Sequence, residues 1–317
     1  MIIWNIISEE LECEVEVGPI TVLKGSHELW FKLVRLIDDY FTNKNTEVQI
    51  YEDTQLLYKK DWECLFIPYD AHLQFDKINS KSPLKILLDE MSEELSYSPV
   101  YLELLSIWDE LRDELDLVNT KIEKYGLTLK MESFGIDHLK DFLLFTATKN
   151  IMTPIEYKTM LLNLFADKLN DKKRLIIIEL PELYANNTQF TEFINIVEQL
   201  SKMGIQFLIV TQKNLSGNHN YVFDEKIINE ALLENMKRKV FSEVPFICEN
   251  DLYEEAKDHL LKVVDNFVFQ NRKLGLSTIQ NEAIIVLLYV MINHLNIRIP
   301  LDMSGISPNL QAFVKSY

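Results

Sequence analysis

The stretch Arg174-Leu-Ile-Ile-Ile-Glu-Leu-Pro-Glu182 decides the fold of this chain. Four aliphatic residues, three of them β-branched, precede Glu179, and β-branched side chains suit the pleated surface of a strand. Because no polar residue interrupts the run, we expect other elements to cover both faces of this strand. Pro181 has no backbone N–H to donate, so the strand ends before it.

A helix and a second buried strand follow. Residues 190–202 carry apolar side chains at helical spacing, and Gly204 provides a stop signal. Residues 205–212, Ile-Gln-Phe-Leu-Ile-Val-Thr-Gln, form another apolar run. Strand, helix and strand in this order predict a right-handed βαβ unit in a parallel sheet.

The composition indicates a helix-rich globular protein with an acidic excess. The 317 residues are 47% hydrophobic, with 8 Gly and 9 Pro, and allow one large domain or two ordinary ones. A net charge of −17 opposes indiscriminate binding to nucleic acids or membranes, but it permits a locally basic surface. The three cysteines are dispersed, and we find no signal peptide or apolar run of membrane-spanning length. We therefore expect a cytoplasmic protein without a membrane partner.

Periodicity divides the chain into three parts. An α/β head is expected from residues 1–82 and 127–222, with a buried helix over 29–40 and strands at 2–7, 12–17, 20–24, 47–51, 55–58, 62–68 and 127–131. A helical leg is inserted at 83–126, and helices over 137–148 and 154–169 lead back to the central strand. The extension 223–317 is almost wholly helical, over 225–240, 251–273 and 278–296.

The second helix of the leg, 99–124, carries a heptad seam. Its apolar residues alternate spacings of three and four, which is typical of coiled coils and helical hairpins: Tyr101, Leu104, Trp108, Leu111, Leu115, Val118 and Ile122. An acidic stripe runs beside the seam and consists of Asp109, Glu110, Asp113, Glu114 and Asp116. Like charges at this spacing repel, and a hard cation such as calcium would relieve the repulsion. An ordinary solvated helix face is the alternative interpretation.

The stretch Ile20-Thr-Val-Leu-Lys-Gly-Ser-His27 has the layout of a phosphate-binding loop, and Glu179 stands where such folds place an acidic metal-holding strand. A working loop needs several glycines followed by Lys and Ser/Thr, whereas Gly25 is the single glycine here. We therefore predict a degenerate P-loop-ATPase-like head, α/β with a mixed, largely parallel sheet, and no nucleotide chemistry. No catalytic residue is predicted, since the six histidines are scattered and no hydrolase motif occurs.

Several of these features together resemble one family. The early Ile-Thr-Val-Leu strand, the leg with Glu114-Leu-Asp-Leu117, the aliphatic strand before Pro181 and the following strand Phe207-Leu-Ile-Val210 are similar to the type II-A CRISPR-associated adaptation proteins called Csn-two. The likeness covers roughly residues 1–222, and the helical extension resembles the long variants of that family.

The resemblance implies a non-enzymatic protein. It implies a homotetrameric ring that binds double-stranded DNA ends and depends on calcium, with the acidic stripe of the leg as the calcium site. It also implies spacer acquisition alongside the CRISPR integrase proteins and the type II effector nuclease.

The candidate phosphate contacts are Lys24, Lys32, Lys59 and Lys60. We expect these lysines to flank the first strand–helix turn, the edge at which this fold class presents ligands. Two alternatives stay open: a nucleotide hydrolase of the chromosome-maintenance or ABC-head type, and a structural scaffold that dimerises through the heptad seam.

Overall fold

A computed structural model describes residues 2–316 except 26, 75–83, 147–151, 168–170, 224–225, 271–273, 277–278, 280, 303 and 305–306. The chain forms two compact units. Residues 1–69 and 169–317 make the first, and residues 70–168 make the second. The predicted leg therefore lies within the second unit, and the predicted C-terminal extension belongs to the first.

The first unit contains a six-stranded sheet of order β10-β9-β3-β8-β7-β6. Its strands are β3 (Ile20–Gly25), β6 (Trp62–Ile67), β7 (Lys173–Glu179), β8 (Ile205–Val210), β9 (Asn218–Phe223) and β10 (Lys226–Asn229). All neighbouring strands pair in parallel except β10, which is antiparallel to β9. The chain is thus an α/β protein whose main sheet is largely parallel, as predicted.

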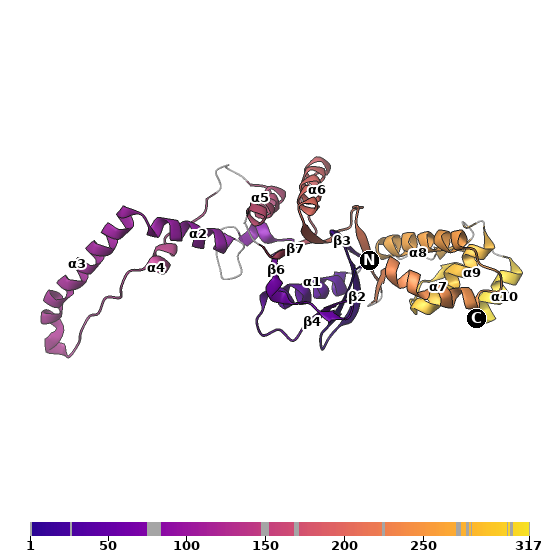
Figure 1. Cartoon of the computed structure of the whole chain (residues 1–317), viewed down its shortest axis with the longest axis horizontal. Helices are drawn as coiled ribbons and strands as arrows, with labels where there is room; N and C mark the ends of the chain where they lie inside the picture. Colours follow the sequence, from indigo (N-terminus) through magenta and orange to yellow (C-terminus); the bar gives the residue numbers. More distant parts are fainter. Residues whose placement is uncertain are drawn as a thin grey trace. The chain divides into compact units, whose positions relative to one another are not determined.

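The central strand β7 has both faces covered. Leu175 and Ile177 belong to the core around α1 (His27–Thr42), whereas Ile176 and Ile178 on the opposite face are also fully buried. In Figure 1, α1 and α6 (Asn187–Lys202) lie on opposite sides of these strands. The expected sequence β7–α6–β8 forms two adjacent parallel strands joined by a helix, which confirms the predicted strand–helix–strand unit in a parallel sheet.

A second sheet covers the other side of α1. It has the order β2-β1-β4-β5, all antiparallel, and is formed by β1 (Ile2–Ile7), β2 (Glu12–Val17), β4 (Gln49–Glu52) and β5 (Gln55–Leu56). Trp4, Ile6 and Ile50 of this sheet share one core with Leu33 and Ile37 of α1. The helix is therefore enclosed between two sheets, which explains why a large part of its surface is apolar, although Lys32 on its remaining face is exposed.

Helices dominate the C-terminal part of the first unit. They are α7 (Glu230–Glu243), α8 (Asn250–Gln270), α9 (Glu282–Leu295) and α10 (Pro308–Ser316), and a short parallel pair is formed by β11 (Leu274–Gly275) and β12 (Leu301–Asp302). The predicted helix over 225–240 begins only at Glu230. Ile227 and Ile228, which are buried and β-branched, pair with β9 instead as part of β10.

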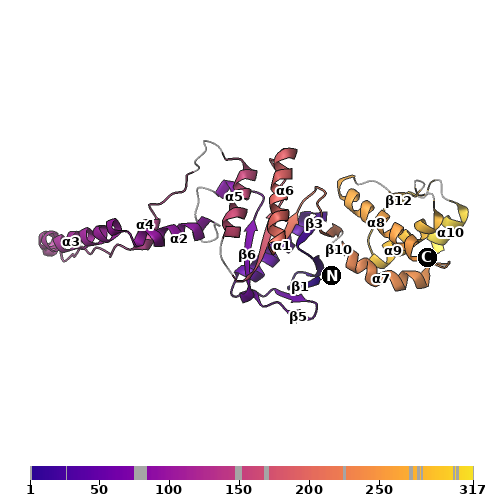
Figure 2. The same ribbon diagram turned by 45° about the horizontal axis from the view of Figure 1, so that its top comes forward.

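The second unit contains α2 (Leu84–Ser96), α3 (Pro99–Ile122), α4 (Ile136–Lys140), α5 (Pro154–Asp167) and the short 3₁₀ helices η2 (Ala71–Gln74) and η3 (Glu123–Tyr125). Figure 2 shows α3 beside the segment that returns to α4. The strand predicted at 127–131 is absent from this returning segment. The Asn119 amide satisfies both backbone groups of Leu129, donating to the carbonyl at 3.0 Å and accepting from the N–H at 2.7 Å.

The helix predicted over 137–148 is also much shorter. It ends at Lys140, and the described residues 141–146 are irregular. Phe142 and Leu144 are 76% and 78% exposed, so no packed apolar face sustains a longer helix. No helix in the described ranges is long and apolar enough to cross a membrane.

Gly25 is required by a close backbone approach. Its φ is +111°, and a Cβ built there would lie 2.1 Å from the carbonyl oxygen of Val222, its register partner on β9. The single glycine of the supposed phosphate loop thus lets β3 and β9 pair closely, which is a structural role independent of any ligand.

Gly25→Ala is expected to destabilise the protein more than Gly204→Ala. Gly204 also has a positive φ, +92°, but nothing lies within 4 Å of an added Cβ. The control isolates left-handed backbone strain of about 1–2 kcal/mol. Gly25→Ala adds the clash with Val222, about 1–3 kcal/mol more by the usual cost of overpacking. Urea unfolding of both variants measures the difference, and equal losses would contradict the steric argument.

Candidate nucleic-acid interface

The carboxyl-terminal edge of the main sheet is closed by an ion pair. Lys24, at the end of β3, is 3% exposed, and its Nζ lies 2.9 Å from each carboxylate oxygen of Asp265 on α8. The same ammonium donates to Oδ1 of Asn214 at 2.8 Å. Lys24 therefore belongs to the interior of the protein, contrary to the solvent-facing position on which its predicted phosphate contact depends.

Tyr221 on β9 is buried and lies within the electrostatic influence of Asp265. Burial first, and the negative charge of Asp265 second, raise the pKa of Tyr221 to about 12. Tyr221 therefore stays neutral across the physiological range and its hydroxyl lies 3.2 Å from Nδ1 of His219. Nothing in this pairing prepares a reactive oxygen.

Glu179, at the end of the central strand, also forms an ion pair within the protein. It is fully buried, and its Oε1 accepts from Nη1 of Arg35 at 2.5 Å. The backbone N–H of Tyr69 also donates to Oε2 at 3.3 Å. Arg35 is held over the ring of Phe31 at 3.4 Å, so α1 supplies a fixed cation for this carboxylate. The group that a nucleotide hydrolase would use to hold a metal is thus bound to an arginine.

Cys13 in β2 and Cys64 in β6 have unreactive thiols. Burial raises the pKa of the Cys13 thiol to about 12 and that of the Cys64 thiol well above its usual range. Thiolates are the reactive form, and both thiols stay protonated at neutral pH.

The opposite, amino-terminal edge of the sheet carries basic residues from distant parts of the sequence. Trp62 and Lys173 are register partners at the start of β6 and β7. This pairing brings Lys59 and Lys60, in the 3₁₀ helix η1 (Lys59–Asp61), to the same edge as the basic run 172–174. We call this group the basic edge: Lys59, Lys60, Lys172, Lys173 and Arg174.

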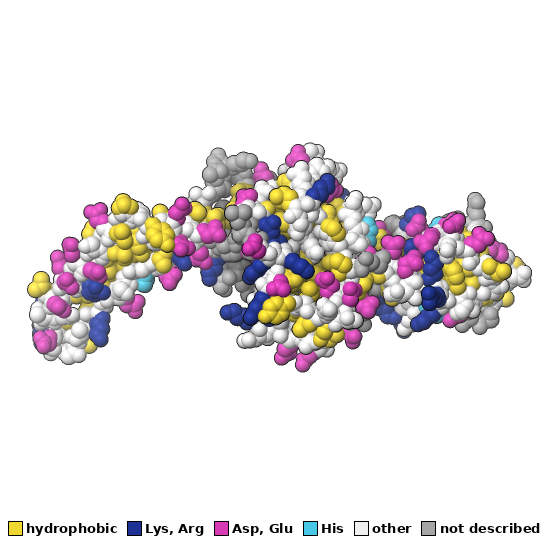
Figure 3. Space-filling model, in the orientation of Figure 1, with side chains coloured by type: hydrophobic (Ala, Val, Ile, Leu, Met, Phe, Trp, Pro, Cys, Tyr) yellow, Lys and Arg dark blue, Asp and Glu magenta, His cyan; other side chains and the backbone are white. Residues whose placement is uncertain are grey.

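Two lysines of the basic edge lie over aromatic rings. Nζ of Lys173 is 5.3 Å from the centre of the Trp62 ring, and Nζ of Lys60 is 5.9 Å from that of Tyr58. Lys59 donates to the carbonyl oxygens of Asn43 and Lys44 at 2.8 and 3.2 Å, which fixes the neighbouring loop. Figure 3 shows several Lys and Arg side chains close together on the part of the molecule that carries β4 and β6 in Figure 1.

Lys32 belongs to neither edge group. It is 45% exposed on α1, and its Nζ lies 2.7 Å from Oε2 of Glu10. The hydrogen bond and the positive charge of Lys32 lower the pKa of Glu10. The structure thus brings Lys59 and Lys60 together and separates Lys24 and Lys32 from them, so the four predicted lysines do not surround one turn.

Sequence inspection missed Lys172, Lys173 and Arg174 as partners of Lys59 and Lys60. A signal was present, because both basic runs stand directly before apolar strands. The starts of neighbouring parallel strands meet at one edge, but the sequence does not show that strands more than 100 residues apart are neighbours.

The acidic stripe of α3 does not form a metal centre within one chain. Asp109, Glu110, Asp113, Glu114 and Asp116 are all exposed, and Asp109 pairs with Arg112. Among the residues that the structure describes, no three His, Cys, Asp or Glu side chains are grouped to hold a metal ion. Five separate carboxylates along a helix face do not fit the compact set of oxygens that calcium needs.

The heptad seam of α3 is half covered. Trp108 donates from its indole to the carbonyl of Glu132 at 3.0 Å, and its ring packs on Phe134. An overlapping stripe along the same helix, which includes three residues of the seam, stays open and is 38–73% exposed: Val100, Leu104, Ile107, Leu111 and Val118. We call it the open stripe. Figure 3 shows hydrophobic side chains gathered near the junction of α2 and α3, where this stripe begins.

Comparison with known proteins adds information on the fold. No protein-family model and no curated protein matches the chain. A crystal structure of Stu0660 of Streptococcus thermophilus is similar, with a TM-score of 0.52 and 13% identity over 99% of both chains. CbiO1 from Clostridium perfringens, part of the ABC transporter complex cbiONQ, has a TM-score of 0.35 and 11% identity, covering 77% of this chain and 95% of that one. The similarity to Stu0660 shows a shared fold over the whole length.

Asp265→Ala is expected to destabilise the protein, because it leaves the buried ammonium of Lys24 unpaired. Removing one partner of a buried pair costs about 3–5 kcal/mol, and since Asp265 is 26% exposed we expect the lower end. Asp258→Ala, an exposed change on the same helix, should be nearly neutral. The double variant Lys24→Met/Asp265→Leu should recover most of the loss in urea unfolding. A neutral Asp265→Ala would show that the pair carries no stability.

Proposed function

We propose that this protein is a non-enzymatic double-stranded DNA-binding protein that recognises DNA ends without reading base sequence and acts in CRISPR spacer acquisition. The basic edge is the observation that carries the proposal. Five cationic side chains from two separate segments gather at one edge of a rigid sheet, and such groups bind phosphates without sequence preference. We place the DNA contacts at Lys59, Lys60 and Lys173, and we keep Lys32 as a peripheral contact.

A degenerate P-loop-ATPase-like head is part of the proposal. The strand–turn–helix of β3 and α1 has the layout of a phosphate loop, but Lys24 and Glu179 are each bound to an opposite charge of the protein. Ion pairs at both positions favour a binding role over a nucleotide hydrolase. Magnesium-dependent ATP or GTP turnover that Glu179→Gln abolishes would support the hydrolase instead.

The open stripe supports self-assembly. A surface helix with an unpaired heptad face gains free energy by packing against another helix. We propose that copies of the chain pair through this stripe on the way to a tetrameric ring that encloses the duplex. A ring also reconciles a net charge of −17 with DNA binding, because the basic edges of several copies would face one interior while the acidic surfaces face solvent.

Calcium dependence and the CRISPR partners stay predictions of the resemblance. The acidic stripe of a single chain gathers no ligand set, so a calcium ion would need oxygens from outside one chain. Contacts with the integrase proteins and the effector nuclease likewise depend on the family resemblance alone.

Linear duplex DNA should bind, and relaxed closed circles of the same length should not, because a ring is entered only from an end. If one or two of Lys59, Lys60 and Lys173 in each of four chains contact phosphates at the same time, log K should fall with log salt with a slope of roughly −4 to −7. Lys60→Ala/Lys173→Ala should weaken binding to all sequences alike and flatten the slope. Fluorescence anisotropy at several salt concentrations measures both quantities.

The control for this titration is Lys239→Ala, which removes an exposed lysine on α7, the helix that follows β10 at the other end of the strand order from β7 and β6. Its salt slope should equal that of the unchanged protein. Equal affinity for circles and linear fragments would refute encirclement. A slope insensitive to Lys60→Ala/Lys173→Ala would refute the basic edge as the contact surface.

Leu111→Glu should reduce the oligomeric state, because it places a charge in the middle of the open stripe. Leu102→Glu is the matched control: the same substitution on the same helix, at a residue that is 57% rather than 48% exposed and faces away from the stripe. Light scattering coupled to size-exclusion chromatography measures the mass of each variant. If both variants assemble like the unchanged protein, the stripe is not an assembly surface.

A further inference from the structure

A cavity of about 460 Å³ lies beside the hairpin of β4 and β5, within the first unit. We call it the hairpin pocket. It is lined by the hairpin residues Glu52–Leu57 and by Tyr58, Asp61, Trp62 and Lys173. Its volume falls in the range of pockets that bind small molecules or side chains.

The floor of the hairpin pocket is rigid and apolar. Leu57 and Trp62 are 8% and 5% exposed and belong to the main core of the head. The hairpin is anchored by hydrogen bonds from the Asp53 N–H to Ile3 at 3.0 Å and from the Leu57 N–H to Ile50 at 2.8 Å. A ligand would therefore meet a preformed surface and pay little to order it.

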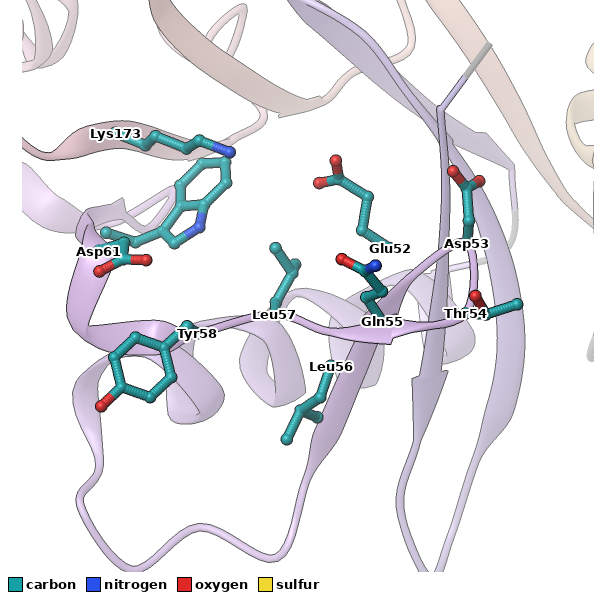
Figure 4. Close-up of a pocket in the computed structure, with 10 residues that line it drawn as sticks. Glu52, Asp53, Thr54, Gln55, Leu56, Leu57, Tyr58, Asp61 and Lys173 are labelled. Carbon is teal, nitrogen blue, oxygen red and sulfur yellow. The ribbon is translucent and has the colours of Figure 1, made fainter.

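The walls of the hairpin pocket carry more negative than positive charge. Three carboxylates, Glu52, Asp53 and Asp61, accompany one ammonium, Lys173, for a net charge of −2. Figure 4 shows Glu52 and Lys173 extending toward the cavity from opposite sides, with Leu57 pointing inward between them. This charge balance favours a cationic group over a phosphate.

The kind of cation follows from the spacing of the acids. The three carboxylates are not grouped as metal ligands, since no such group is found in the ranges the structure describes. A side chain with an apolar stem and a charged head suits a cavity with an apolar floor and acids on its rim, which is the chemistry of Arg and Lys.

The surroundings indicate an extended chain segment as the carrier of that cation. β5 is the end strand of its sheet, so its outer side is not paired by another strand of the order β2-β1-β4-β5. Leu56 and Tyr58 are 55% and 60% exposed, and in Figure 4 both are directed away from the cavity. A segment lying along β5 could place one cationic residue in the pocket and its apolar neighbours against Leu56 and Tyr58.

We propose that the hairpin pocket is a docking site for an Arg or Lys side chain on an extended segment of a partner protein. Lys173 then has two opposing effects. It supports DNA at the basic edge and it repels the cation of the partner segment in the pocket. This proposal does not depend on DNA binding, and the two can fail separately.

The test uses the full chain and an array of capped hexapeptides in which one position is Arg, its neutral isostere citrulline, or Glu. We expect the best Arg peptides to bind at least about tenfold more tightly than their citrulline counterparts, the size of effect a desolvated charge pair provides. Glu52→Gln should remove this preference. Glu47→Gln, an exposed acid outside the pocket, should retain it.

Lys173→Met gives a change of opposite sign for the two ligands. It keeps an apolar stem over Trp62 but removes the like charge, so Arg peptides should bind several-fold more tightly while duplex DNA binds more weakly. No preference for Arg over citrulline, or equal behaviour of Glu52→Gln and Glu47→Gln, would overturn the proposal. Three other results would assign the pocket to another occupant and overturn the proposal as well. They are a preference for Glu peptides, tighter binding of mononucleotides than of any Arg peptide, and self-association that Glu52→Gln abolishes.

Discussion

The burial of β7 on both faces is the constraint on which the head depends. Its side chains alternate between two cores, so one helix layer must cover each face of the strand. On one face α1 fills this place, and the second sheet β2-β1-β4-β5 covers the apolar side chains on the far side of α1. The hairpin of β4 and β5 exists in this position because that second sheet must extend over α1. The hairpin pocket is thus a by-product of covering the helix.

The same packing makes the two edges of the main sheet chemically different. At the carboxyl-terminal edge, where parallel sheets usually bind ligands, Arg35 from α1 and Asp265 from α8 neutralise Glu179 and Lys24. A buried charge is tolerated only with a partner, so these contacts close the edge as effectively as a bound ligand would. At the amino-terminal edge Lys60, Lys172 and Lys173 are exposed. The edge with exposed lysines is therefore the better place for a binding surface.

Local pattern was enough to predict part of this arrangement. The aliphatic run before Glu179 and the dense apolar residues of the helix at 29–40 specify burial by themselves, and both contribute to the core. The ion-pair partners of buried charges were not predictable. Lys24 and Asp265, for example, are 241 residues apart and only the fold brings them together. The basic edge was not predicted for the same reason, because it depends on the pairing of β6 with β7. The predicted secondary structure was wrong where tertiary contacts determine the conformation of a segment. Ile227 and Ile228, for example, pair with β9 in the sheet instead of forming part of a helix.

A net charge of −17 shapes how any polyanion would approach this protein. At physiological ionic strength charges interact over about 8 Å, so a phosphate at the basic edge is attracted by the nearby lysines and is barely affected by acids elsewhere. At low salt the range grows to about 30 Å at 0.01 M, and the acidic surface then opposes the same approach. Added salt thus weakens the attraction and the repulsion together. The salt slope measured for DNA should consequently be shallower at the low-salt end than the number of phosphate contacts implies, and it should reach the contact-determined value only where the distant acids are screened.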